Sequence, residues 1–116
     1  MKCLVHETVG EDAITLDDGQ SIHERIKPEL IVGHEVELDF DGVSVFASPF
    51  FNAAIGQLLK DLRPEDLNRL LRVLNLNSTG YEVLRRVIDN AKKYYAASPD
   101  YREAQAKVLE RLSEAE

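Results

Sequence analysis

The sequence predicts a single α/β domain with a small mixed β-sheet, helices packed mainly on one face, and an extra C-terminal helix. Residues 35–40 alternate strictly between charged and apolar side chains, as in a strand with one wet face. Apolar residues at helical spacing recur in the segments between the strand candidates. A chain of 116 residues with 44% hydrophobic content can bury one core. We therefore expect one domain over residues 1–97, followed by an amphipathic helix over residues 98–116.

Charge and composition exclude several classes of function. The net charge is −7, and residues 1–48 carry 11 acidic and 3 basic side chains. Such an acidic half repels nucleic acid and favours a protein partner. The sequence has neither a membrane-spanning apolar run nor a signal-peptide pattern, so we expect a cytoplasmic protein. The single cysteine, Cys3, excludes an internal disulfide and is expected to be a buried, inert thiol.

The N-terminal half is predicted to contain one helix and three strands, over residues 2–7, 13–16 and 35–40. Ser21 and Glu24 have the spacing of a capping box, which predicts that the helix begins at Ser21. Pro28 is expected to bend or break this helix, and Gly33 to close it. The charged side of the third strand predicts either a sheet with a wet or thinly covered face or an edge position for that strand.

The middle of the chain predicts a second helix over residues 49–62, with proline at its first position. A short helical turn from Pro64 to Asn68 follows. Residues 70–76 favour a strand, although so short a run also fits a helix.

Two more helices are predicted at the C-terminal end. Thr79 and Glu82 form a second capping box, and the helix after it extends to about Ala96. The last helix has a narrow apolar stripe that either packs on the domain or pairs with another chain as a homodimer. The stripe consists of Tyr101, Ala104, Val108, Leu112 and Ala115.

No catalytic, metal or cofactor site is predicted, so we do not expect an enzyme. His6, His23 and His34 are scattered and lack the spacing of metal ligands. Asp39 and Asp41 have no accompanying histidine or third acid, and strand-end solvation with turn formation explains them. The sequence contains no glycine-rich phosphate loop and no nucleophile–base pair. Basic side chains on the helix near residue 90 are interpreted as a solvated face: Arg85, Arg86, Lys92 and Lys93.

The most informative segment covers residues 36–52, where the strand that ends near residue 40 is followed by a short loop and then by the start of the next helix. Ser48 stands there at a helix start, where its side chain either caps the helix or, if phosphorylated, acts as a charge switch. Phe46, Phe50 and Phe51 surround it. Three aromatic residues exceed what one core stripe needs, so one is expected to be exposed as a partner anchor.

Residues 33–43 (GHEVELDFDGV) and 48–56 (SPFFNAAIG) resemble the STAS-like domain family, an uncharacterised bacterial group. The resemblance extends from about residue 18 to residue 95 and includes residues 87–91 (VIDNA). The family is similar to STAS domains, which include the anti-sigma-factor antagonists. Those antagonists bind a kinase-like anti-sigma factor and are controlled by phosphorylation of a serine at the loop–helix junction.

The resemblance implies a non-enzymatic regulatory module whose phospho-acceptor is Ser48. It implies a protein partner, an anti-sigma-like or histidine-kinase-type ATPase. The partner-binding residues would be Phe46, Ala47, Ser48, Pro49, Phe50 and Asn52. The loop differs from the antagonists in having Ala47 in place of an acid, and Pro49 and Phe50 in place of a Ser-Gly pair. The alternative is a constitutive self-association module or structural subunit that uses the C-terminal helix.

Overall fold

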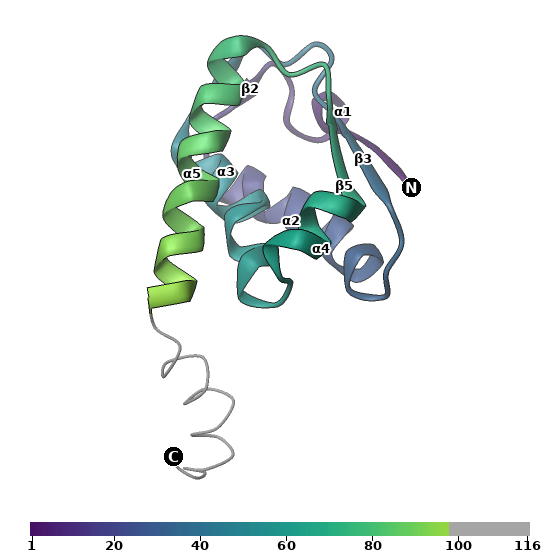
Figure 1. The fold of residues 1–116 in the computed structure, drawn as a ribbon. Helices are drawn as coiled ribbons and strands as arrows, with labels where there is room; N and C mark the ends of the chain where they lie inside the picture. The colour runs from purple at the N-terminus through teal and green to yellow at the C-terminus, as the bar shows by residue number, and fades with distance from the viewer. Residues whose placement is uncertain (98–116) are drawn as a thin grey trace, which may run out of the picture.

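The computed structural model describes residues 1–97 as two small parallel sheets and a set of helices (Figure 1). The predicted helix over residues 98–116 lies outside the described residues. In chain order the elements are β1 (Lys2–Leu4), α1 (Val5–Val9), β2 (Asp12–Ala13), α2 (Leu16–Ile31), β3 (Val36–Asp39), β4 (Val45–Phe46), α3 (Ser48–Ala54), the 3-10 helix η1 (Gly56–Lys60), α4 (Pro64–Leu70), β5 (Leu71–Leu74) and α5 (Ser78–Ala97).

The strands confirm the α/β class but are parallel, where a mixed sheet was expected. The main sheet has the order β1-β3-β5, and β2 and β4 form a separate two-stranded ladder. All of these pairings, within residues 1–97, are parallel. The reason is the connectivity: a helix-containing crossover separates each strand from its sheet neighbour, and crossovers return the chain in the same direction.

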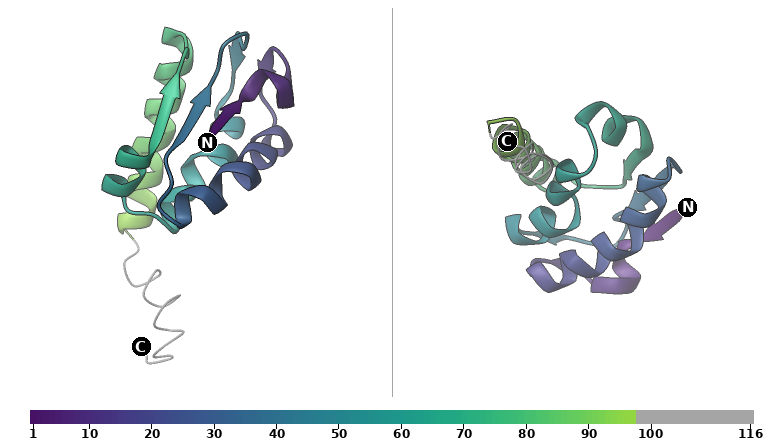
Figure 2. Two further views of the ribbon diagram at one scale, coloured as in Figure 1. Left: turned by 90° about the vertical axis from the view of Figure 1, so that its right-hand side faces the viewer. Right: turned by 90° about the horizontal axis from the view of Figure 1, so that it is seen from below.

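β3 lies at the centre of the main sheet, so the wet-face prediction is confirmed and the edge alternative is wrong. Val36 and Leu38 point inward and are fully buried. On the opposite face, Glu37 stands between Lys2 of β1 and Arg72 of β5 in the register. Alternating charges across neighbouring strands stabilise such a solvated face. Figure 2 (left) shows β1, β3 and β5 in front, with α5 behind them.

α2 begins earlier than its predicted capping box. Its N-cap is Thr15, whose Oγ1 accepts a hydrogen bond from the Asp18 amide at 3.1 Å. Ser21 therefore lies inside the helix, and α2 continues past Pro28 to Ile31 without a break. Gly33, at φ +88°, ends it as predicted, and its amide donates to the Leu30 carbonyl at 3.0 Å.

Other boundaries also differ from the predictions. The first strand stops at Leu4, and α1 follows it directly. The predicted helix over residues 49–62 is divided at Ile55 into α3 and η1. α4 extends to Leu70, and β5 confirms the strand interpretation of the segment after it. α5 is capped by Asn77, which accepts from the Gly80 amide at 2.7 Å, rather than by Thr79.

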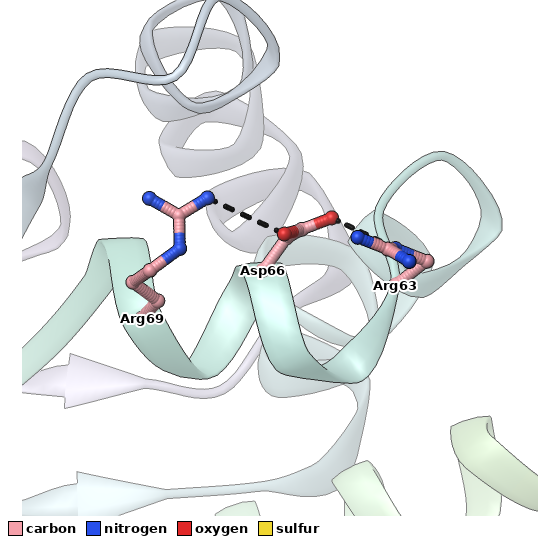
Figure 3. Close-up of polar contacts among 3 residues, drawn as sticks. All are labelled: Arg63, Asp66 and Arg69. Atoms are coloured by element: carbon pink, nitrogen blue, oxygen red, sulfur yellow. Dashed lines mark hydrogen bonds and ion pairs between the residues drawn. The ribbon is translucent and has the colours of Figure 1, made fainter.

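The start of α4 is fixed by a three-residue ion cluster on the surface (Figure 3). The Asp66 carboxylate lies between Arg63, whose Nε is 3.1 Å from Oδ2, and Arg69, whose Nη2 is 3.3 Å from Oδ1. The hydrogen bond from Arg63, followed by that from Arg69, lowers the pKa of Asp66. Within residues 1–97, no helix is both long and apolar enough to cross a membrane.

Candidate functional site

The strand-to-helix junction is an elbow that backbone hydrogen bonds attach to β2. After β3, the Val43 amide donates to the Phe40 carbonyl at 2.9 Å across a turn in which Gly42 adopts φ +86°. The amides of the next two residues both donate to the Glu11 carbonyl, at 2.9 and 3.2 Å. The Ala47 amide then donates to the Ala13 carbonyl at 3.0 Å. The loop therefore has a fixed backbone path up to the first residue of α3.

Ser48 is exposed at the tip of this elbow. It is the first residue of α3, and Ala47 occupies the N-cap position, where no side-chain hydrogen bond is made. The interpretation of Ser48 as a plain helix cap is therefore wrong. Pro49, also exposed, occupies the first turn as predicted. The Ser48 hydroxyl is consequently accessible from solvent.

A cluster of four phenylalanine rings supports the elbow from beneath. The Phe40 ring centroid lies 5.9 Å from that of Phe46, 6.4 Å from that of Phe50 and 5.8 Å from that of Phe51. Phe46 and Phe51 stack with 13° between their planes. Phe50 and Phe51 are fully buried, whereas Phe46 is half-buried. Phe50 is therefore a core residue, and its prediction as a partner contact is wrong.

Apolar side chains that sequence reasoning did not select are exposed beside the elbow. Ile14 follows β2, Leu16 begins α2, and Val45 belongs to β4; their exposed fractions are 39%, 58% and 47%. The β2–β4 ladder and the Ala13–Ala47 hydrogen bond bring these segments together. We call the combined set the elbow surface: Ile14, Leu16, Val45, Ala47, Ser48, Pro49 and Asn52. The β2–β4 pairing was not predicted, because two-residue strands carry no periodicity.

Acidic residues border the elbow surface. Asp12 pairs with Val45 in the β2–β4 ladder, and Asp17 and Asp18 lie in the first turn of α2. All of them come from the strongly acidic N-terminal half of the chain. The exposed apolar side chains of the elbow surface therefore have acidic neighbours in the β2–β4 ladder and in the first turn of α2.

Asp39 is nearly buried at the C-terminal end of β3 and has a structural role. Its Oδ1 accepts from Asn75 Nδ2 and from the Asp41 amide, both at 2.9 Å, and Lys2 Nζ lies 3.6 Å from Oδ2. These bonds, that of Asn75 above all, lower the pKa of Asp39. Asn75 reaches it from a left-handed conformation with φ +59°. The predicted turn-forming role is confirmed for Asp39, whereas its predicted solvation is wrong, because the side chain is nearly buried.

The candidate metal ligands and the cysteine lie at separate places in the described part of the chain. Residues 1–97 contain no cluster of three or more His, Cys, Asp or Glu side chains that could hold a metal ion. His34 is exposed and lies 2.9 Å from Glu29 Oε1. Cys3 is fully buried, as predicted, and burial raises the pKa of its thiol. The side chains interpreted as a solvated face are all exposed: Arg85, Arg86, Lys92 and Lys93.

His23 is nearly buried in α2, and its Nδ1 has no hydrogen-bond partner. Burial lowers the pKa of His23, against a smaller opposing effect of its bond to the Ala54 backbone. Lys27 lowers this pKa further, whereas Asp61 and Glu24 raise it. The folded state therefore holds its proton less tightly than the unfolded state, whose histidine pKa is about 6.5. The stability contribution of neutral His23 is complete above that value and is lost as the pH falls through the folded pKa.

We expect the free energy of unfolding to decrease when wild-type protein is moved from about pH 7.5 to about pH 5.5. One proton contributes at most about 1.4 kcal/mol per pH unit to this slope. His23→Gln removes the titrating group and should flatten the slope, whatever it does to stability at neutral pH. Urea titrations across the pH range measure it, with His34→Gln as the exposed control. A His23→Gln slope equal to the wild-type slope would contradict this assignment.

Comparison with known proteins finds a family model that covers the elbow. The family described as STAS-like domain of unknown function (DUF4325) matches residues 18–81. The matched range includes β3, β4, α3 and β5, and therefore the whole segment from Phe40 to Asn52. Neither the search of curated proteins nor that of solved structures gives a match. Because the match covers more than half of the chain, the protein belongs to the family of STAS-like domains.

Proposed function

We propose that this domain is a non-enzymatic regulatory module that binds a protein partner through the elbow surface, with Ser48 as its phosphorylation switch. The observation that carries the proposal is the contrast between adjacent residues. Ser48 and Pro49 are exposed, whereas the next two residues, Phe50 and Phe51, are fully buried. A rigid, aromatic-anchored support thus presents an accessible hydroxyl to solvent.

The surroundings of Ser48 support binding of a protein rather than a small molecule. Ile14, Leu16 and Val45 offer apolar contact area that remains in water in the isolated domain. The acidic rim of Asp12, Asp17 and Asp18 would steer a basic surface toward it. The resemblance to anti-sigma-factor antagonists suggests the class of partner, an anti-sigma-like or histidine-kinase-type ATPase.

Phosphorylation would act here through charge. A phosphate group on a serine side chain adds about one and a half to two negative charges at neutral pH. On a surface that is already acidic, this addition changes complementarity to the partner without altering the buried Phe50 and Phe51 beneath it. The switch therefore needs no conformational change in the domain.

The experiment uses the full chain as bait and quantifies the ATPase that it captures from native lysate. We expect Ser48→Asp to reduce capture about tenfold, because the partner would bury the new carboxylate among the apolar side chains of the elbow surface without a paired cation, and Ser48→Ala to leave it unchanged. Ser44→Asp is the matched control, because Ser44 is an exposed serine of the same loop. Intact-mass and fragment analysis of the protein from native cells should locate phosphate on Ser48.

Two outcomes contradict different parts of the proposal. If Ser48→Asp captures as much ATPase as wild type, the switch is wrong although the interface can stand. The second outcome is that wild type captures no ATPase, and that Val45→Asp does not reduce the capture of any other protein. In that case the elbow surface is not a regulatory interface.

A further inference from the structure

The two edges of strand β5 differ in their partners within residues 1–97. One edge pairs with β3, whereas no described strand pairs with the other, which we call the outer edge (Figure 2, left). The Leu74 carbonyl accepts from the Phe40 amide just after β3, so the Val73 carbonyl, one residue earlier, points to the outer edge. There it accepts a long hydrogen bond from the Tyr81 hydroxyl, at 3.4 Å. The outer edge is therefore accessible in the described part of the chain.

An apolar groove of about 460 Å³ lies beside β5, between this strand, α4 and α5. Leu71 and Val73 line it from β5, Leu67 from α4, and Leu84 and Ile88 from α5. Helix α5 packs mainly on α3 and η1 rather than on β5, and Leu71, Val73 and Ile88 remain only half-buried. Folded proteins usually cover or protect an apolar sheet edge, because its unpaired backbone groups invite association with other strands. The edge and the groove together therefore call for an occupant.

Charged side chains on the solvated face of the main sheet alternate in sign from strand to strand. Lys2 of β1 stands beside Glu37 of β3, which in turn stands beside Arg72 of β5. Arg72 is exposed, and none of the ion pairs among residues 1–97 includes it. Opposite charges on neighbouring strands stabilise a sheet. The next place in this row, beyond the outer edge of β5, therefore favours an acidic side chain.

We propose that the outer edge of β5 binds an extended segment of a separate protein, in which one acidic residue stands between two apolar residues. The segment adds a strand to the main sheet. Because successive side chains of a strand point to opposite faces, its apolar side chains enter the groove beside Leu71 and Val73, and its acidic side chain lies beside Arg72. On its paired edge β5 already accepts this pattern, the Val-Glu-Leu of residues 36–38 in β3. The site shares no residue with the elbow surface.

Two labelled peptides and the full-length protein test this pairing. The probe is an end-capped, fluorescein-labelled peptide with the core Val-Glu-Leu between serine and threonine residues. The second peptide has lysine in place of the glutamate and is otherwise identical. Fluorescence anisotropy measures the Kd of each peptide. We expect wild type to bind the glutamate peptide about fivefold more tightly than the lysine peptide, because lysine exchanges an attraction beside Arg72 for a repulsion.

Charge reversal on the protein is the matched test. Arg72→Glu should invert the preference, and its binding of the lysine peptide would show that the variant is folded. Arg72→Gln removes the charge without placing a second acid beside Glu37, and it should bind both peptides equally. Arg86→Glu is the control, because Arg86 is exposed on α5 and does not line the groove. This control should retain the wild-type preference.

The other occupants of the edge give different results, and each would overturn the proposal. If neither peptide binds wild type saturably, the outer edge does not accept a strand. Equal affinity of wild type for both peptides would show that no charge is recognised beside Arg72, and would leave the groove to an apolar ligand without strand pairing. If light scattering shows wild type as a dimer that the glutamate peptide does not dissociate, a second copy occupies the edge.

Discussion

Replacing Gly19 by alanine should destabilise the domain by about 3 kcal/mol or more, the upper range for overpacking. A Cβ at Gly19 would overlap the carbonyl oxygen of Phe50 and lie only 2.9 Å from the Cβ of Ala53. The obstructing atoms belong to the backbone and first side-chain carbon of α3, which cannot rotate away. The substitution must therefore separate α2 from α3, the two elements in closest contact in the domain.

The direction of the stability change distinguishes a packed glycine from an exposed one. In an exposed helix interior, glycine-to-alanine substitution stabilises by about 1 kcal/mol, because alanine has the higher helix propensity. Urea denaturation of Gly19→Ala and wild type measures the difference. Ser21→Ala is the control, because Ser21 is exposed on the same helix; we expect it to be within about 0.5 kcal/mol of wild type, as surface substitutions usually are. A Gly19→Ala protein as stable as wild type would show that α2 and α3 do not meet at this glycine.

Gly19 also illustrates which part of the fold was predictable from sequence. The stripe Ile22, Ile26 and Leu30 was recognised, and Gly19 lies on the same helix face one turn earlier. The capping-box spacing at Ser21 obscured this continuation, because serine and glutamate three residues apart also occur by chance inside polar helix faces. The actual cap, Thr15, bonds the Asp18 amide with its hydroxyl. Local caps compete, and the choice between them depends on tertiary contacts.

The pairing of strands that lie far apart in the sequence was harder to predict than the elements themselves. The alternating strand and α5 were predicted from a local period, and β5 from a short apolar run, but parallel pairing depends on which segments the crossovers bring together. The same limit applies to the candidate site. Ser48 and its aromatic neighbours were found from local sequence, whereas Ile14 and Leu16 joined the elbow surface only through the β2–β4 ladder. Phe50 was assigned to the surface because sequence spacing alone does not distinguish adjacent inward and outward positions at a helix start.

The second large effect concerns the aromatic cluster under the elbow. We expect Phe51→Ala to destabilise the domain by about 3–5 kcal/mol, the typical cost of removing a buried phenylalanine. The Phe51 ring is fully buried and packs against Phe40, Phe46 and Phe50, with centroid distances of 5.8, 5.7 and 5.4 Å. Its removal leaves three rings facing a cavity that the surrounding helices can fill only partly. Denaturant titration of the variant and of wild type gives the value.

The comparison with Phe46→Ala shows how the cluster holds Ser48 in place. Phe46 stacks on Phe51 but is half-buried, so its loss should cost clearly less. Pro49→Ala, at an exposed position above the cluster, should change stability by less than about 1 kcal/mol. If Phe51→Ala costs no more than Phe46→Ala, the rings do not form one packed unit. The elbow would then depend on its backbone bonds to β2, and Ser48 would lose the rigid support on which its proposed role as a switch depends.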